Sequence, residues 1–342
     1  MSAPLQISDI ASVVTKGTTP TTYGMLYVEE GLNFVKAEAL NDDSGLDPNG
    51  FAQISEETHD RLARSKLEED DVLITIAGAN VGKCGYVTSD ILPANTNQAV
   101  GIIRSKQDAV CPRYLYYWLK RPAFRQYCLS VAGQSAQPNL NLTNLKNIKI
   151  ELPDLSTQKT TSFILSRYDN LIQNNRRRIA LLEESARLLY REWFVHFRVS
   201  GSHSNLLINK APIEWRRNKL SEVLTLQRGF DLPATQRSSG EVPVFGSTGI
   251  VGYHNESKVE RPTIVTGRSG SLGKILITDT LSWPLNTTLW MKELKIPSIY
   301  FAYFLLQHLP LAAFDGGAAV PTLDRNVLHE LEVLIPSHSV LS

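Results

Sequence analysis

Hydrophobic and polar positions follow one pattern twice along the chain. A run rich in β-branched residues, 71–76, ends in a Gly-rich turn that carries Gly82 and Lys83, and an apolar segment returns after it. A second such run, 262–266, leads into a turn that carries Gly273 and Lys274. Strand, Gly-rich turn and returning strand predict a β-hairpin in each copy.

Further matching segments flank each hairpin in the same order. Each copy opens with a basic residue and Gly, has a polar turn and an aromatic helix after the hairpin, and closes with an apolar strand before Pro. The pairs are Lys16-Gly17 and Arg228-Gly229, 95–98 and 286–288, 114–119 and 300–305, and the strands before Pro153 and Pro336. The aromatic stripes Tyr114/Tyr117/Trp118 and Tyr300/Tyr303/Phe304 are expected in the cores. This order indicates domain duplication, with unlike polar segments at 18–50 and 230–257.

A long helix is predicted between the two copies. No Pro or Gly occurs from Ser156 to Arg198, and Ser156 or Thr157 is a candidate N-cap. Apolar residues recur there at steps of three and four, which is typical of a coiled-coil seam. Its main positions are Leu171, Asn175, Ile179, Leu182, Leu189 and Trp193. Asn175 either fixes the register of a partner helix or lies at the edge of the seam.

These elements predict an α+β fold. Two similar β-rich domains with packed helices, 1–155 and 201–342, are joined by a helix of the coiled-coil type at 156–200. Because one helix cannot bury its own seam, we expect another long helix beside it. No second long helix is predicted in this chain.

Composition agrees with a globular protein that has two cores. The chain has 342 residues, of which 42% are hydrophobic and 20% are charged. It contains no run of about 18 apolar residues and does not start with a secretory signal pattern. Three cysteines without metal-ligand spacing are typical of a reducing compartment, so we expect a cytoplasmic protein without a membrane span.

Positive charge is concentrated in the spacer. Residues 1–155 hold 14 Lys and Arg against 18 Asp and Glu, residues 156–200 hold 8 against 4, and residues 201–342 hold 13 against 12. The run 176–178 is three consecutive arginines. It is either a solvated helix face or a contact to DNA phosphates or a partner.

Catalytic motifs are not found. The Gly-Lys turns do not have phosphate-loop spacing, because three residues separate Gly78 from Gly82 and five separate Gly267 from Gly273. No G-x-S-x-G, H-E-x-x-H or methyltransferase motif occurs, and the seven histidines are scattered. We therefore expect no catalytic residue, no metal site and no cofactor in this chain.

Polar and basic side chains in the loops are candidates for DNA contacts. Asn and Gln can pair with adenine and Arg with guanine, although ordinary turns favour many of the same residues. Lys83 and Lys274 either contact phosphates from a tight hairpin tip or are solvated. The candidates are Lys16, Thr18, Asn80, Lys83, Asn97, Gln98, Gln134, Ser135, Gln137, Asn139, Arg228, Arg237, Arg268, Ser269, Lys274 and Asn286.

The chain resembles the specificity subunit of Type I restriction–modification systems. The resemblance rests on the two Gly-Lys hairpins, the two closing strands before Pro, and residues 174–191, which are similar to the family's central conserved helix. It implies two target recognition domains, 1–155 and 201–342, that each read half of a split double-stranded DNA sequence. The helix at 156–200 would set the gap between the halves.

Partners also follow from this resemblance. The family's modification subunits bind S-adenosylmethionine and methylate adenine, and its restriction subunits use ATP and Mg. One departure is that the family's second conserved helix does not follow the second module. We therefore expect a second copy or a separate helix to cover the seam. The alternative function is an interaction scaffold or decoy that holds modification subunits without reading DNA.

Overall fold

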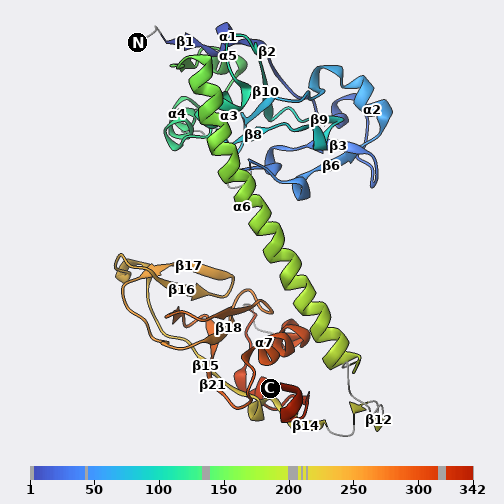
Figure 1. Cartoon of the computed structure of the whole chain (residues 1–342), viewed down its shortest axis with the longest axis vertical. Helices are drawn as coiled ribbons and strands as arrows, with labels where there is room; N and C mark the ends of the chain where they lie inside the picture. The colour runs from blue at the N-terminus through green and yellow to red at the C-terminus, as the bar shows by residue number, and fades with distance from the viewer. Residues whose placement is uncertain are drawn as a thin grey trace. The chain divides into compact units, whose positions relative to one another are not determined.

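The computed structural model describes residues 4–42, 45–132, 139–198, 207–208, 211–212, 215–314 and 321–341. The chain divides into two compact units, Met1–Arg178 and Ile179–Ser342. The long helix α6 (Leu155–Tyr190) contributes to both units (Figure 1). Mixed sheets and helices confirm the α+β class.

The first unit is built on an antiparallel four-stranded sheet in the order β2-β10-β7-β8. Its strands are β2 (Ala11–Lys16), β10 (Val100–Ser105), β7 (Val72–Thr75) and β8 (Cys84–Tyr86). β7 and β8 pair antiparallel on either side of the Gly-rich turn, which confirms the first predicted hairpin.

Smaller sheets and helices complete this unit. In a three-stranded sheet, β3 (Leu32–Val35) lies between the antiparallel β6 (Ala52–Ile54) and the parallel β9 (Ala94–Thr96). β1 pairs with β11, and β4 pairs with β5. The remaining bounds are β1 (Leu5–Gln6), α1 (Ile7–Ile10), β4 (Leu40–Asn41), β5 (Gly45–Leu46), α2 (Glu56–Arg61), α3 (Pro112–Leu119), α4 (Pro122–Ala132), α5 (Leu142–Lys146) and β11 (Lys149–Ile150).

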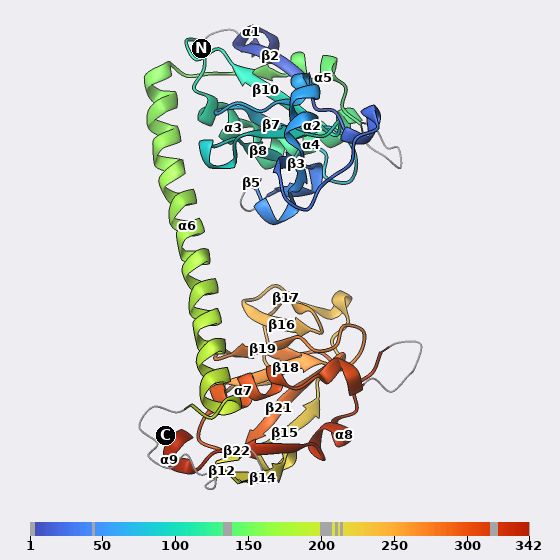
Figure 2. The ribbon, with the colours of Figure 1, turned by 90° about the vertical axis from the view of Figure 1, so that its right-hand side faces the viewer.

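The second unit repeats this topology. Its four-stranded sheet has the order β15-β21-β18-β19, and in its three-stranded sheet β16 lies between the antiparallel β17 and the parallel β20. Helix α7 lies against β18 and β19 (Figure 2). The bounds are β12 (Leu207–Ile208), β13 (Ala211–Pro212), β14 (Arg216–Lys219), β15 (Leu224–Arg228), β16 (Val242–Gly246), β17 (Gly249–His254), β18 (Thr263–Gly267), β19 (Ile275–Thr278), β20 (Trp283–Pro284), β21 (Thr288–Leu294), α7 (Ile299–His308), α8 (Arg325–His329), β22 (Glu332–Ile335) and α9 (His338–Leu341). Two units with the same strand orders confirm the duplication.

Equivalent backbone hydrogen bonds fix the alignment of the two units. Gly17 N donates to Val100 O, and Gly229 N donates to Thr288 O, each at 3.0 Å. Val100 and Thr288 are therefore equivalent, and two residues earlier Gln98 is equivalent to Asn286. The alignment of 95–98 with 286–288 expected from the sequence is wrong by several residues, because polar turns have no hydrophobic periodicity that fixes a register.

Each core contains one face of an aromatic helix, and four residues of the predicted stripes, Tyr117, Trp118, Tyr303 and Phe304, pack half-buried against the cores. In α7 the buried residues are Phe301, Ala302, Leu305 and Leu306, whereas Tyr300 is 65% exposed. In α3 the buried residues are Leu115, Tyr116 and Leu119, and the predicted stripe is half-buried. The most buried face of each helix thus lies about one residue away from the predicted stripe, which forms the edge of that face.

Helix α6 confirms the predicted spacer, with a different N-cap. The Asp154 carboxylate accepts a hydrogen bond from Thr157 N at 3.0 Å. The Thr157 hydroxyl also donates to this carboxylate at 2.7 Å, and this bond, together with the one from Thr157 N, lowers the pKa of Asp154. Asp154 therefore caps the helix, not Ser156 or Thr157. At the other end, one π-helical turn (Arg191–Val195) follows Tyr190.

Polar residues, not the apolar seam, attach α6 to the first unit. Gln158, Ser162 and Ser166 are buried at steps of four residues. Gln158 Oε1 accepts from Cys111 N at 2.9 Å, and its Nε2 donates to Pro153 O at 2.8 Å. The predicted seam is exposed instead, at 55% for Leu171 and 67% for Leu182.

The second unit holds the C-terminal end of α6 through aromatic contacts. The buried ring of Tyr190 lies 5.8 Å from that of Phe301 and 5.6 Å from that of Phe304.

Among the described helices, none has a stretch long and apolar enough to cross a membrane.

Candidate nucleic-acid interface

Several predicted DNA-contact residues meet at one end of the first unit's central sheet. β2 ends at Lys16, β10 begins at Val100 and β7 ends at Thr75, and antiparallel pairing places these three points at the same end. We call it the loop end of the sheet. Lys16 and Gln98 are exposed there. Asn139 lies nearby, because it forms a β-bridge with Ala77, and it is exposed.

The loop end of the second unit carries different side chains on the same backbone frame. Arg228 ends β15, Arg268 follows β18 and Asn286 precedes β21. Arg268 Nη1 donates to Asn286 O at 3.4 Å, and the Asn286 amide donates to Asp231 Oδ1. Arg228 Nη2 also donates to Asp231 Oδ1, at 3.4 Å.

Asp231 was not among the predicted site residues. Its carboxylate is 67% exposed and joins Arg228 to Asn286. The only sequence signal is its place three residues after Arg228, in the loop that opens the module.

Two equivalent glycines let the chain close tightly at the loop ends. A Cβ added at Gly17 would lie 2.1 Å from Thr96 O, and one added at Gly229 would lie 2.2 Å from Leu285 O. Both overlaps are with backbone atoms, which cannot swing aside as a side chain can. Gly is therefore required for the close approach of the two segments.

Thr18 is poorly placed for a direct DNA contact, because it is buried and its hydroxyl already has a partner. Arg64, on the 3₁₀ turn η4 (Ala63–Ser65), donates from Nη2 to Thr18 Oγ1 at 2.9 Å. The exposed Arg64 thus brings a cation next to Lys16-Gly17. Sequence reasoning missed Arg64, which is 46 residues away from Thr18.

A buried amide holds η4 in place. The Asn95 side chain is fully buried, and its Nδ2 donates to Leu62 O and to Ser65 Oγ, each at 3.1 Å. Its Oδ1 bonds His59 Nδ1 at 2.5 Å. These bonds fix the backbone on both sides of Arg64.

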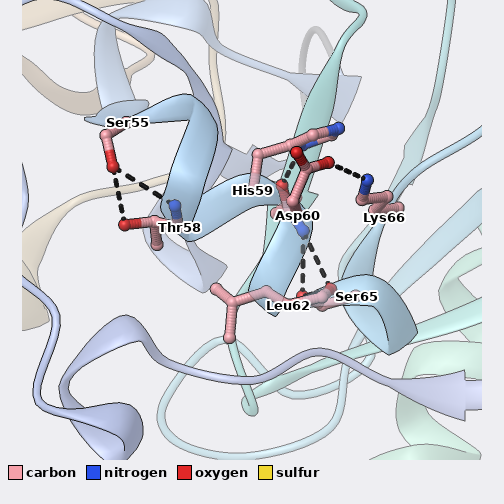
Figure 3. Close-up of polar contacts among 8 residues, drawn as sticks. Ser55, Thr58, His59, Asp60, Leu62, Ser65 and Lys66 are labelled. Carbon is pink, nitrogen blue, oxygen red and sulfur yellow. Dashed lines mark hydrogen bonds and ion pairs between the residues drawn. The ribbon is translucent and has the colours of Figure 1, made fainter.

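Helix α2 is held at both ends in the same region (Figure 3). Ser55 Oγ accepts from Thr58 N at 3.2 Å and caps the helix. Lys66 Nζ forms an ion pair with Asp60 at 2.7 Å. The segment that carries Arg64 is therefore anchored on both sides.

The Gly-Lys turns lie at the loop ends, but both lysines have partners within the chain. Lys83 Nζ is 3.9 Å from Asp42 Oδ2, and its side chain is only 18% exposed. Lys274 Nζ donates to Thr248 O at 2.6 Å. Gly270, and not Gly267, is equivalent to Gly78, since both have a positive φ, of 84° and 89°.

The other predicted residues lie in different settings. Arg237 donates from Nη1 to Val251 O at 3.0 Å. Asn97 Oδ1 accepts from Ala99 N at 3.2 Å, and Ser269 is half-buried beside Thr322, with which it forms a β-bridge. Asn80 is half-buried within its turn. Gln134, Ser135 and Gln137 lie outside the described residues.

Within the described ranges, no three His, Cys, Asp or Glu side chains are grouped so that they could hold a metal ion. Burial raises the pKa of the Cys128 thiol to about 12 and also raises that of Cys84. Both thiols therefore stay protonated at neutral pH and are poor nucleophiles.

Comparison with known proteins connects this arrangement to a family. Residues 3–184 match the family model described as Type I restriction modification DNA specificity domain. Over 233 residues the chain is 27% identical to the Type I restriction enzyme MjaIX specificity subunit of Methanocaldococcus jannaschii, covering 67% of this chain and 52% of that subunit. Over 143 residues it is 31% identical to the EcoBI specificity subunit of Escherichia coli, covering 41% and 30%. The chain thus aligns with about half or less of the length of these relatives.

A solved structure extends the likeness to both units. The S subunit of a Type I restriction–modification system from M. genitalium superposes with a TM-score of 0.64, over 99% of this chain and 86% of that one. Its sequence is 16% identical, so this likeness concerns the fold. The family model covers more than half of the chain, and the second unit repeats the topology of the first. The chain therefore belongs to the Type I restriction–modification DNA specificity family.

Proposed function

We propose that this chain is a non-catalytic subunit that recognises a two-part sequence in double-stranded DNA, with each unit reading one part. The proposal is supported above all by the two loop ends, which have the same backbone structure but carry different side chains. The two loop ends share strand order, backbone hydrogen bonds, a basic residue (Lys16, Arg228) and an amide (Gln98, Asn286), but one adds Asn139 and the other adds Arg268 and Asp231. One frame with two side-chain sets is what two different readers require.

The chemistry of these side chains fits base edges and phosphates. Gln98 and Asn139 can each form two hydrogen bonds with adenine, and Arg268 can do so with guanine. The exposed Asp231 carboxylate can accept from the cytosine amino group. Lys16 and Arg64 supply positive charge for phosphates in the first unit.

The enzymatic partners are part of the same proposal. We propose that modification subunits carrying S-adenosylmethionine dock on the exposed seam of α6, and that restriction subunits using ATP and Mg join them. Support comes from the exposure of Leu171, Ile179 and Leu182, each of which leaves more than half of its surface in water. A second copy of the chain or a separate helix can cover the same seam.

The experiment first identifies the target sequence and then measures binding to it. Methylated adenines are mapped in cells that express the chain with its modification subunits, and binding of the complex to the mapped site is compared with a scrambled site at moderate salt. The proposal predicts at least a 100-fold preference for the mapped site, in line with specific DNA binding. Equal affinity for the two DNAs would contradict it.

A second candidate function is an interaction scaffold that holds modification subunits without reading DNA. The exposed seam favours it, because docking there needs no loop end. The scaffold predicts normal assembly of the complex together with equal affinity for mapped and scrambled DNA, so the same binding experiment separates the two functions.

A further inference from the structure

The lysine of the Gly-Lys turn contacts the same chain connection in both units. In the second unit this is the tip between β16 and β17, where Lys274 bonds Thr248. In the first unit it is the connection between the equivalent strands β3 and β6, where Lys83 pairs with Asp42. Equivalent lysines therefore hold equivalent connections, although the connections differ in length and sequence.

The contact in the second unit is direct and short. The 2.6 Å distance from Lys274 Nζ to Thr248 O is that of a charge-assisted hydrogen bond. The neighbouring Ser247 also packs on the turn, since a Cβ added at Gly267 would lie 3.1 Å from Ser247 Cβ. The tip of the β16–β17 hairpin thus rests on the Gly-Lys turn.

A second cation holds the same hairpin further along. Arg237 Nη1 donates to Val251 O at 3.0 Å and lies directly under Gly252, where an added Cβ would be 3.0 Å away. Lys274 and Arg237 therefore fix two carbonyls of one hairpin.

This hairpin presents apolar side chains to solvent. On β17, Ile250 is 51% exposed, Val251 43% and Tyr253 55%. Apolar groups can contact the thymine methyl group in the major groove. A hairpin with such side chains at a loop end is suited to reading DNA if its position is fixed.

The contact in the first unit is an ion-pair cluster. Asp42 Oδ2 lies 2.6 Å from Arg125 Nη1 and 3.9 Å from Lys83 Nζ. The side chain of Lys83 is mostly covered, whereas Lys274 is exposed and is assigned its role by its hydrogen bond to Thr248. A phosphate ligand needs an ammonium group that is open to the DNA, which argues against this role for Lys83.

We propose that Lys83 and Lys274 are positioning residues and not phosphate ligands, and that the β16–β17 hairpin is a specificity-determining element of the second unit. This rests on the proposed function, since specificity has meaning only if the complex reads DNA. In each unit, the lysine would hold a chain connection in place and would not make the phosphate contact that the sequence had suggested.

The test compares Lys274→Met, Lys274→Arg and Lys292→Met in the complete complex with its modification subunits. Lys292 is an exposed lysine of the same unit, so its variant is matched in charge. Binding is measured over a series of salt concentrations on the mapped target and on DNA altered in one part only. Amide hydrogen exchange of residues 242–254 is measured without DNA.

Lys274→Met is expected to exchange faster than the wild type at 242–254. It should lose about tenfold in discrimination against DNA altered in the second part, with unchanged discrimination in the first part and an unchanged salt slope. Lys274→Arg should restore both properties, and Lys292→Met should resemble the wild type. A phosphate ligand would instead lower the slope of log affinity against log salt by about 0.9.

A lowered slope with unchanged hydrogen exchange would overturn the positioning role. A wild-type complex that binds all DNAs equally would refute the proposed function and the specificity of the hairpin together, whereas hydrogen exchange would still test the lysine contact by itself. In the first unit, Lys83→Met and Asp42→Asn should each lose discrimination against DNA altered in the first part of the target, and tighter DNA binding by Asp42→Asn would contradict the positioning role.

Discussion

At the scale of single residues, Gly17 and Gly229 show why a glycine follows the basic residue in each module. The chain passes so close to a neighbouring backbone that any Cβ would overlap a carbonyl oxygen. We expect Gly17→Ala and Gly229→Ala each to lower the free energy of unfolding by about 1–3 kcal/mol, as overpacked sites do. Urea unfolding followed by circular dichroism measures this change.

The two variants are controls for each other. Hydrogen exchange should increase at 96–100 in Gly17→Ala and at 284–288 in Gly229→Ala, and in neither variant at the other site. Both variants with wild-type stability would show that the backbone approach is looser than described.

His329 predicts a dependence of stability on pH. Its Nε2 accepts a hydrogen bond from Leu226 N at 2.9 Å, which requires a neutral ring, and burial lowers its pKa. The unfolded ring titrates near 6.5, so below that pH the unfolded state binds more protons and the folded state loses stability. We expect the free energy of unfolding to fall between pH 7 and pH 5, and to fall less in His329→Gln.

The exposed His308 of the same unit provides the matched control for this prediction. His308→Gln should keep the wild-type pH dependence of urea unfolding. An identical pH dependence in wild type, His308→Gln and His329→Gln would refute the role given to His329.

At the scale of elements, α6 has two faces with different tasks. Its polar face binds the first unit through Gln158, while the seam with Leu171 and Leu182 stays exposed. We expect the double substitution Leu171→Glu with Leu182→Glu to leave thermal unfolding unchanged and to weaken binding of modification subunits at least 100-fold. Isothermal titration calorimetry measures this affinity.

Asn174→Glu with Gln173→Glu is the matched control, since it adds the same charge at exposed polar positions of the same helix. The control should bind as the wild type does. If the seam variant also binds normally, the modification subunits dock elsewhere.

The elements differ in how far the sequence predicted them. Both hairpins and both aromatic helices were predicted correctly, because β-branched runs before Gly-rich turns and dense aromatic runs are strong local signals. The inner face of α6 was missed, since Gln158, Ser162 and Ser166 have no hydrophobic periodicity. Their spacing of four residues places them on one face of the helix. That spacing identifies a buried face only when the surface that packs against it is known.

At the scale of the whole molecule, the duplication was visible in the sequence, and the candidate sites were visible only in part. Lys16, Gln98, Arg228 and Asn286 were named because basic and amide residues stand beside Gly or in turns. Arg64 comes next to Thr18 only through tertiary folding. The same holds for the contacts of Lys83 with Asp42 and of Lys274 with Thr248. Such pairings depend on the approach of distant segments, which no local pattern records.

The two units are proposed to read separate parts of one DNA target. Methylated sites are mapped in cells that carry modification subunits with the wild type, with Gln98→Ala and Asn139→Ala, or with Arg268→Ala and Asn286→Ala. We expect the methylated sites to show relaxed sequence in one part of the target for the first pair of substitutions, and in the other part for the second pair. Relaxation of the same part by both pairs, or of neither part in complexes that still methylate DNA, would contradict it.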